Sequence, residues 1–354
     1  MKTTYGLFTG RMAELIAFYE LDERNNGNYD RDIDELFDSI MTFFYETSDT
    51  SFCSGKSGII WGLLFLQKKG WLSSEELDFL KDEYEVIFIS FKSDIEAGNF
   101  DHLYGATGKL KTLIFSENAF LEEAIAIYLD GLKTHIIYTQ NEAFLYENFI
   151  SKKKGKVVNF GLAHGLTSII ITLCEIVKIT QSEYALNLLS GLTNYIRSFK
   201  KAASLSVYPS HITDGIPDYN SPFGWCYGDL IISVAFFKAW QINQDQSLFI
   251  EAKWLAKNSA EKINANQIHY DDNFICHGTT GMALMFFQLY KQFGILSLQS
   301  AGQKLVLMQD DSDFKIEGGL LDGKTGIILS KALLSNKIND DWLQPLLLNI
   351  KLDL

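Results

Sequence analysis

The sequence contains little cysteine, little proline and no excess of positive charge. Four cysteines in 354 residues are too few for a disulfide framework, so free thiols and a reducing cytoplasm are expected. A net charge of −13 argues against a nucleic-acid partner. Three of the four prolines, Pro209, Pro217 and Pro222, fall in one segment before Cys226. That segment is predicted to be an ordered loop, because proline fixes φ and ends helices.

Long apolar runs are also absent. The longest uncharged stretch, residues 157–174, contains Asn159, His164 and two glycines. It is therefore predicted to be a loop entering a buried helix, and no membrane span is expected. The first residues have no apolar signal-peptide core, which again favours the cytoplasm.

A short glycine motif recurs along the chain at intervals of 45 to 63 residues. Four copies also carry glycine at their fourth position. The first glycines of the seven copies are Gly10, Gly55, Gly105, Gly165, Gly228, Gly278 and Gly323. Because the intervals are regular, they indicate a repeat architecture more strongly than the motif itself does.

Each copy is followed by two kinds of helical pattern. Segments directly after the motif, such as 231–237 and 282–287, are apolar on all sides and are expected to be buried. The stretches between copies, such as 73–91, 181–199 and 246–263, are amphipathic. Each repeat is therefore predicted to consist of an inner and an outer helix.

The repeats predict an all-α fold in a single domain, residues 1–354, since strand signals are scarce and no linker interrupts the chain. Seven helix pairs can stack as an open solenoid or close into a ring. A ring would gather the glycine loops at one end, where glycine allows tight turns and close backbone approach.

Two cysteine motifs lie fifty residues apart. Cys226 stands in Trp225-Cys226-Tyr227-Gly228, and Cys276 is followed directly by His277 and Gly278. Two thiols and one imidazole form a ligand set that suits Zn²⁺ and leaves a fourth position open, as in catalytic zinc sites. The alternative is that both cysteines are packed core thiols. Cys53 and Cys174 are expected to be core or loop thiols without a role in metal binding.

These two motifs, set within the seven glycine repeats, resemble the lanthionine synthetase C-like family, the lantibiotic cyclases. The resemblance covers the chain from Gly10 to Gly326. It implies an α/α toroid (barrel) of about seven inner and seven outer helices. It also implies one Zn²⁺ per chain, held by Cys226, Cys276 and His277.

The implied activity is that of a zinc-dependent lanthionine synthetase. Such an enzyme closes lanthionine and methyllanthionine thioether rings by adding cysteine thiols to dehydroalanine or dehydrobutyrine in a ribosomally made precursor peptide. Three catalytic residues follow from the resemblance: His164 in Ala163-His164-Gly165, Asp101 four residues before Gly105, and Tyr227 near the metal. His164 is the natural proton donor to the enolate. Asp101 either orients His164 or takes the thiol proton, unless it merely caps a helix.

One position departs from the family pattern. Pro222 stands where the family usually has an arginine, four residues before the first zinc cysteine. The alternative hypothesis is therefore a catalytically weakened zinc-containing toroid that binds a peptide or a thiol compound. A third is another α/α-toroid enzyme, prenyltransferase-like or glycan-cleaving. A glycan-cleaving site needs paired carboxylates, and only Asp101 is well placed.

The implied partners are a dehydrated precursor peptide, a dehydratase and an export transporter. Association with a membrane is expected only through such a biosynthetic complex. The sequence leaves open the identity of the peptide, its ring pattern and stereochemistry, and the oligomeric state.

Overall fold

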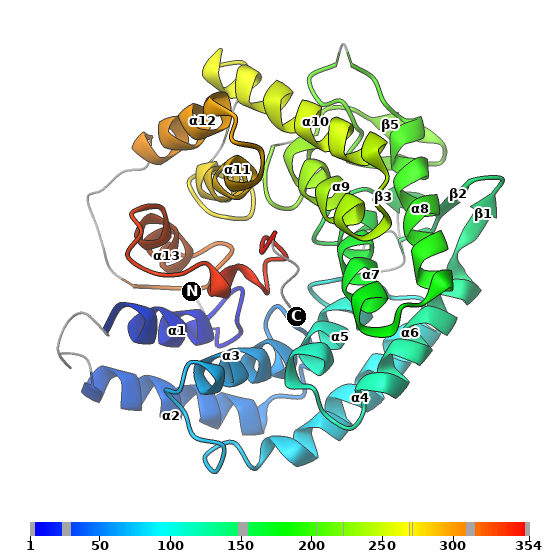
Figure 1. The fold of residues 1–354 in the computed structure, drawn as a ribbon. Coiled ribbons are helices and arrows are strands. Elements are labelled where there is room, and N and C mark those ends of the chain that lie inside the picture. Colours follow the sequence, from blue (N-terminus) through cyan, green and yellow to red (C-terminus); the bar gives the residue numbers. More distant parts are fainter. Residues whose placement is uncertain are drawn as a thin grey trace.

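Seven inner helices begin at the glycine motifs and form a ring (Figure 1). The computed structural model describes residues 4–22, 30–147, 155–202, 204–221, 223–268, 270, 272–308 and 316–350. Each inner helix packs against the next, and the last packs against the first, so the ring is closed. The inner helices are α1 (Arg11–Asp22), α3 (Lys56–Lys68), α5 (Ala106–Ser116), α7 (Leu166–Thr180), α9 (Asp229–Asn243), α11 (Thr279–Phe293) and α13 (Lys324–Leu334).

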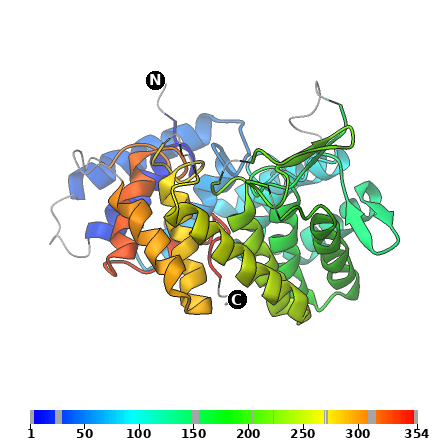
Figure 2. The same ribbon diagram turned by 90° about the horizontal axis from the view of Figure 1, so that it is seen from above.

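Six amphipathic helices form an outer layer around this ring (Figures 1 and 2). Inner helices are apolar on all sides and outer helices on one side, because the two layers are buried to different extents. Residues 229–239 of α9 are all buried, whereas α10 buries one stripe of residues. After α13, the described residues form only a 3₁₀ helix at Asp341–Leu343, in place of a seventh outer helix. The outer helices are α2 (Asp30–Glu46), α4 (Leu80–Glu96), α6 (Leu121–His135), α8 (Glu183–Ser198), α10 (Gln246–Asn264) and α12 (Leu296–Leu307). The predicted all-α toroid of inner and outer helices is confirmed.

A closed circle of backbone hydrogen bonds joins the seven glycine loops. Each bond runs between neighbouring repeats, with N···O distances of 2.7 to 3.2 Å. The donor and acceptor pairs are Phe8 N and Cys53 O, Cys53 N and Leu103 O, His102 N and Ala163 O, Leu162 N and Cys226 O, Cys226 N and Cys276 O, Cys276 N and Leu321 O, and Leu321 N and Phe8 O. Residues far apart in sequence are thereby held side by side.

Sterics explain why a motif has a second glycine, at its fourth position. A Cβ at Gly281 would lie 2.0 Å from the carbonyl oxygen of Ile275, within the preceding loop. The loop can therefore fold back onto the first turn of α11 only if this position has no side chain.

Short strands flank the glycine loops of the fourth and fifth repeats. β1 (Ile137–Thr139) and β2 (Glu142–Phe144) form a hairpin, and β3 (Val157–Asn159), β4 (His211–Thr213) and β5 (Ile216–Asp218) form an antiparallel sheet. β3 leads into the His164 loop, while β4 and β5 belong to the proline-containing segment before Cys226. The ordered loop predicted there therefore includes two strands.

The segment after α13, up to residue 350, runs into the middle of the ring (Figure 1, red). Trp342, Leu346 and Leu348 are buried, and two carbonyl oxygens of this segment have buried partners. The Pro345 oxygen lies 3.1 Å from His102 Nε2, and the Leu346 oxygen accepts a hydrogen bond from Trp225 Nε1 at 2.8 Å. The ring is thus a packed core. No described helix has the length and apolar character needed to span a membrane.

Candidate metal centre and active site

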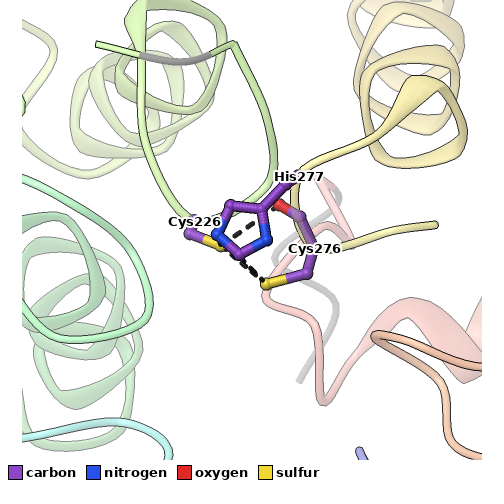
Figure 3. Close-up of side chains that lie close together, drawn as sticks. All are labelled: Cys226, Cys276 and His277. Atoms are coloured by element: carbon purple, nitrogen blue, oxygen red, sulfur yellow. Dashed lines mark hydrogen bonds between the residues drawn. The ribbon is translucent and has the colours of Figure 1, made fainter. Parts of the chain in front are cut away.

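Cys226, Cys276 and His277 converge at the glycine-loop end of the ring (Figure 3). The two Sγ atoms lie 2.7 Å apart, and His277 Nε2 lies 3.4 Å from Cys226 Sγ and 3.9 Å from Cys276 Sγ. This separation of the sulfurs exceeds a disulfide bond of about 2.05 Å, so both cysteines are free thiols. Among the described residues, these three form the one cluster of His, Cys, Asp or Glu side chains close enough to share a metal ion.

The closeness of the two cysteine loops depends on Gly224. A Cβ at this position would lie 2.9 Å from the Cys276 oxygen and 3.0 Å from the His277 Cα. Trp225 N and Cys226 N both donate to the Cys276 oxygen, at 3.0 and 3.2 Å. The ligand set is therefore positioned by backbone contacts as well as by side-chain packing.

The two thiols differ in acidity. A hydrogen bond from Cys226 lowers the pKa of Cys276 to about 6, and the hydrogen bond and charge of His277 act in the same direction. The same hydrogen bond, with burial, raises the pKa of Cys226. The hydrogen bond with Cys276 raises the pKa of His277. Two sulfur donors, one already acidic, and an imidazole nitrogen fit Zn²⁺, because thiolate and imidazole ligands favour zinc over magnesium or calcium.

His164 and Asp101 form a hydrogen-bonded pair beside this cluster. Asp101 Oδ2 lies 2.5 Å from His164 Nδ1, and Asp101 Oδ1 accepts from the backbone N–H groups of Leu103 and Tyr104 at 2.7 and 2.8 Å. Asp101 therefore orders its own loop and orients His164, and it does not cap a helix. Burial lowers the pKa of His164, but the hydrogen bond and charge of Asp101 outweigh it, so this pKa is raised.

Tyr227, the residue after Cys226, stands in the loop that lies between the His164 loop and the Cys276 loop in the order of the repeats. Its hydroxyl oxygen accepts a hydrogen bond from Asn159 Nδ2 at 3.1 Å, and burial raises its pKa. A Cβ on Gly161 would lie 2.5 Å from the ring of Tyr227, so Gly161 leaves room for that ring. The sequence did not single out Asn159 or Gly161.

Several residues of the candidate site occupy the same position within their glycine motifs. His164, Tyr227 and His277 each stand directly before the first glycine of a motif, as do Tyr104 and Asp322. Tyr104 was missed by sequence reasoning: its ring lies parallel to that of His164, with centroids 6.4 Å apart. Aligning the seven motifs on the residue before the first glycine would have identified Tyr104.

Pro222, which stands where the family usually has an arginine, lies outside the described residues.

The other two cysteines, Cys53 and Cys174, are buried and lie outside the cluster of Cys226, Cys276 and His277. Burial raises the pKa of Cys53 to about 12, against the opposing effect of a hydrogen bond with Tyr104. Cys174 is likewise buried in α7. Both cysteines occupy the core, as the sequence predicted.

Comparisons with known proteins identify the family from the sequence and a similar fold among solved structures. The model of the family described as "Lanthionine synthetase C-like protein" matches residues 2–347. Among solved structures, nisin cyclase is similar, with a TM-score of 0.79 at 18% sequence identity, covering 99% of this chain and 93% of that chain. A search of curated protein sequences found no match. Since the family model spans nearly the whole sequence, the chain belongs to the lanthionine synthetase C-like family.

Proposed function

We propose that this protein is a zinc-dependent peptide cyclase that forms lanthionine and methyllanthionine rings in a dehydrated precursor peptide. One observation carries the proposal: a histidine with a raised pKa, oriented by a buried carboxylate, stands beside a cluster of two thiols and one imidazole. Cys276 is close enough to His164 for its charge to contribute to that raised pKa. A proton donor and a candidate metal centre thus share one end of the ring.

Cys226, Cys276 and His277 would hold the zinc ion. When bound, zinc with an open fourth position would ionise the substrate's cysteine thiol near neutral pH. The thiol proton leaves to solvent. The sulfur then forms a bond to the β-carbon of the dehydrated residue, and the electron pair of the C=C bond moves to give an enolate.

His164 delivers the proton that the enolate needs. Because Asp101 accepts from Nδ1, the second proton of the imidazolium is carried on Nε2, from which it passes to the α-carbon. The raised pKa favours the protonated form of His164, and solvent restores its proton after the reaction. Tyr227 keeps its own proton, because its pKa is raised, and is proposed to donate a hydrogen bond to the developing enolate oxygen.

The test uses a dehydrated, cysteine-containing precursor peptide of the lanthionine-forming class. Ring closure adds a thiol to a double bond without changing the mass, so the assay counts free thiols over time. Loss of thiols that requires both bound zinc and His164 is the expected result. Unchanged thiols at every peptide and enzyme concentration would reject the proposal. A dehydratase and an export transporter are proposed as further partners of such an enzyme.

A second candidate is a toroid that binds a peptide or a thiol compound without turning it over. The observation that favours it is Pro222 in the place of the family arginine. The same assay separates the two functions: the binding protein would hold the dehydrated peptide when zinc is present, yet leave its thiols free.

A further inference from the structure

His102 is a buried histidine that joins three parts of the chain beside the candidate active site. It directly follows Asp101, and its backbone N–H donates to the Ala163 oxygen at 3.2 Å, next to His164. Its side chain bonds to the segment after α13, where Nε2 lies 3.1 Å from the Pro345 oxygen. One residue thus connects the loop of Asp101, the loop of His164 and the segment that runs into the middle of the ring.

The hydrogen bond to Pro345 identifies the tautomer of His102. A carbonyl oxygen only accepts, so Nε2 carries the proton and donates it. Nδ1 is buried and has no hydrogen-bond partner among the residues that the structure describes. Burial lowers the pKa of His102 to about 3, so the ring is neutral near neutral pH. His102 therefore does not act as an acid or a base there, and its side chain supplies one directed hydrogen bond.

Aromatic side chains surround His102 and hold its ring in place. The centroid of the imidazole lies 5.3 Å from that of Phe52, 6.0 Å from that of Phe8 and 6.4 Å from that of Trp225. The side chain is fully buried. Because close-packed interiors transmit displacements, a change at His102 is passed on to the neighbouring loops.

A second hydrogen bond from the same segment reaches the loop of the thiol cluster. Trp225 Nε1 donates at 2.8 Å to the oxygen of Leu346, the residue after Pro345. Trp225 directly precedes Cys226, just as His102 directly follows Asp101. Two consecutive carbonyl oxygens therefore hold the loop with the carboxylate and the loop with the first thiol at a common point.

We propose that His102 is a positioning residue for the proton donor: by bonding to the Pro345 oxygen, it holds Asp101 where its carboxylate orients His164. The inference rests on the proposed function for the reaction that this pair serves. Asp101 and His164 belong to different repeats, so the position of the Asp101 loop decides whether Oδ2 meets Nδ1 at 2.5 Å. Catalytic groups must be held to within about 0.5 Å of their productive geometry, and a displacement of about 1 Å can slow a reaction by about a hundredfold.

The experiment compares His102→Leu with His102→Gln. Leucine is apolar and has no donor, whereas the amide nitrogen of glutamine takes the place of Nε2 and can donate to the Pro345 oxygen. The matched control is Tyr128→Phe, which removes a buried hydrogen bond of 2.8 Å between the hydroxyls of Tyr128 on α6 and Thr107 on α5. Circular dichroism checks that each variant is folded. If His102→Leu does not fold, His102→Asn replaces it, because the amide of asparagine is too short to reach the Pro345 oxygen.

The first measurement is the rate of ring closure. We expect His102→Leu to lower kcat by about tenfold or more while KM and zinc content stay the same, because only the proton donor is displaced. His102→Gln and Tyr128→Phe should keep a kcat near that of the wild type. A wild-type kcat in His102→Leu would overturn the proposal. So would an equal loss in His102→Gln, or an equal loss in Tyr128→Phe, which would indicate general loosening of the repeat.

The second measurement is proton NMR, which needs no turnover. Charge-assisted hydrogen bonds are short and strong, and the proton on His164 Nδ1, bonded to Asp101, should give a signal far downfield. Loss of this signal in Asp101→Asn assigns it. We expect the signal to be lost or shifted in His102→Leu and kept in His102→Gln, and an unchanged signal in His102→Leu would contradict the proposal. If the signals behave as expected but the wild-type protein never consumes thiols, the positioning role stands and the cyclase function fails.

Discussion

Asp101 and His164 are joined by a hydrogen bond of 2.5 Å between Oδ2 and Nδ1, although 63 residues separate them in the chain. The bond from His102 N to the Ala163 oxygen brings the two loops together. Asp101 is 3% exposed, so its charge acts on His164 with little screening by water. The pair therefore orients the imidazole of His164 and raises its pKa.

His164→Asn is expected to slow ring closure by about a hundredfold or more, which is the usual effect of removing a general acid. Zinc content should be unchanged, because His164 is not part of the cysteine–histidine cluster. His135→Asn, on the outer helix α6, is the control and should retain the wild-type rate. A His164→Asn variant as fast as the wild type would transfer the role of proton donor to Tyr227 or to a bound water molecule.

The fall of kcat at alkaline pH should depend on Asp101. A general acid works in its protonated form, so the rate falls as pH rises through the pKa of His164. Because the hydrogen bond and charge of Asp101 oppose the effect of burial and raise this pKa, Asp101→Asn lowers it. We expect the fall in rate to begin at lower pH in Asp101→Asn than in the wild type. The measurement is kcat against pH, and identical profiles would show that Asp101 does not tune His164.

The inner and outer helices could be predicted from the sequence because the repeats reveal them. The repeats alone fitted an open solenoid as well as a ring, and the closed ring followed from the family resemblance. The glycine intervals fix seven inner helices, and Cys226 and Cys276 occupy equivalent positions in neighbouring motifs, so ring closure brings them together. The sequence could not decide whether Asp101 orients His164 or takes the thiol proton. The answer depended on which groups face its oxygens, and two of these are backbone amides that carry no sequence signal.

The missing outer helix was harder to foresee for a different reason. Sequence repetition predicts a helix pair for each motif, but the residues after α13 turn into the middle of the ring, where Trp342 and Leu346 are buried. Burial of these large side chains at the centre is a tertiary effect that local periodicity does not encode.

The protein is expected to bind one zinc ion per chain, and Cys276→Ala should abolish this binding without unfolding the ring. Seven inner helices bury enough apolar surface to fold without a metal, unlike a small zinc finger. Cys174→Ala, which removes a core thiol from α7, should keep the zinc. Elemental analysis and circular dichroism provide the test. Global unfolding of Cys276→Ala would identify the ion as structural, and equal zinc in both variants would remove Cys276 from the ligand set.

Trp225→Phe should destabilise the protein more than Trp342→Phe does, by about 1–3 kcal/mol, the penalty for leaving a buried polar group unsatisfied. Trp225 Nε1 donates to the Leu346 oxygen at 2.8 Å, whereas Trp342 Nε1 is buried with no hydrogen-bond partner among the described residues. Both changes remove similar volume, so their difference isolates the hydrogen bond that holds the C-terminal segment beneath Cys226. Urea denaturation measures both free energies of unfolding, and equal values would assign the bond no role in stability.

The last prediction concerns the arginine that the family usually has where Pro222 stands. Asp101 does not lack partners for its charge: Oδ2 bonds to His164, and Oδ1 accepts from the backbone amides of Leu103 and Tyr104. Both oxygens of the carboxylate are already held by hydrogen bonds, so an arginine is not needed to position Asp101. We therefore expect Pro222→Arg to change the rate of ring closure much less than Asp101→Asn, which should lower it by about a hundredfold.

The two variants are compared in the same thiol-counting assay, with zinc content measured for each. A large gain in rate for Pro222→Arg, with Asp101→Asn still as fast as the wild type, would contradict this expectation. That result would mean that Asp101 is idle in the present protein and that the arginine is a true loss. A wild-type protein that binds the dehydrated peptide with zinc present, and yet consumes no thiol until Pro222 is replaced, would favour the binding function over the cyclase.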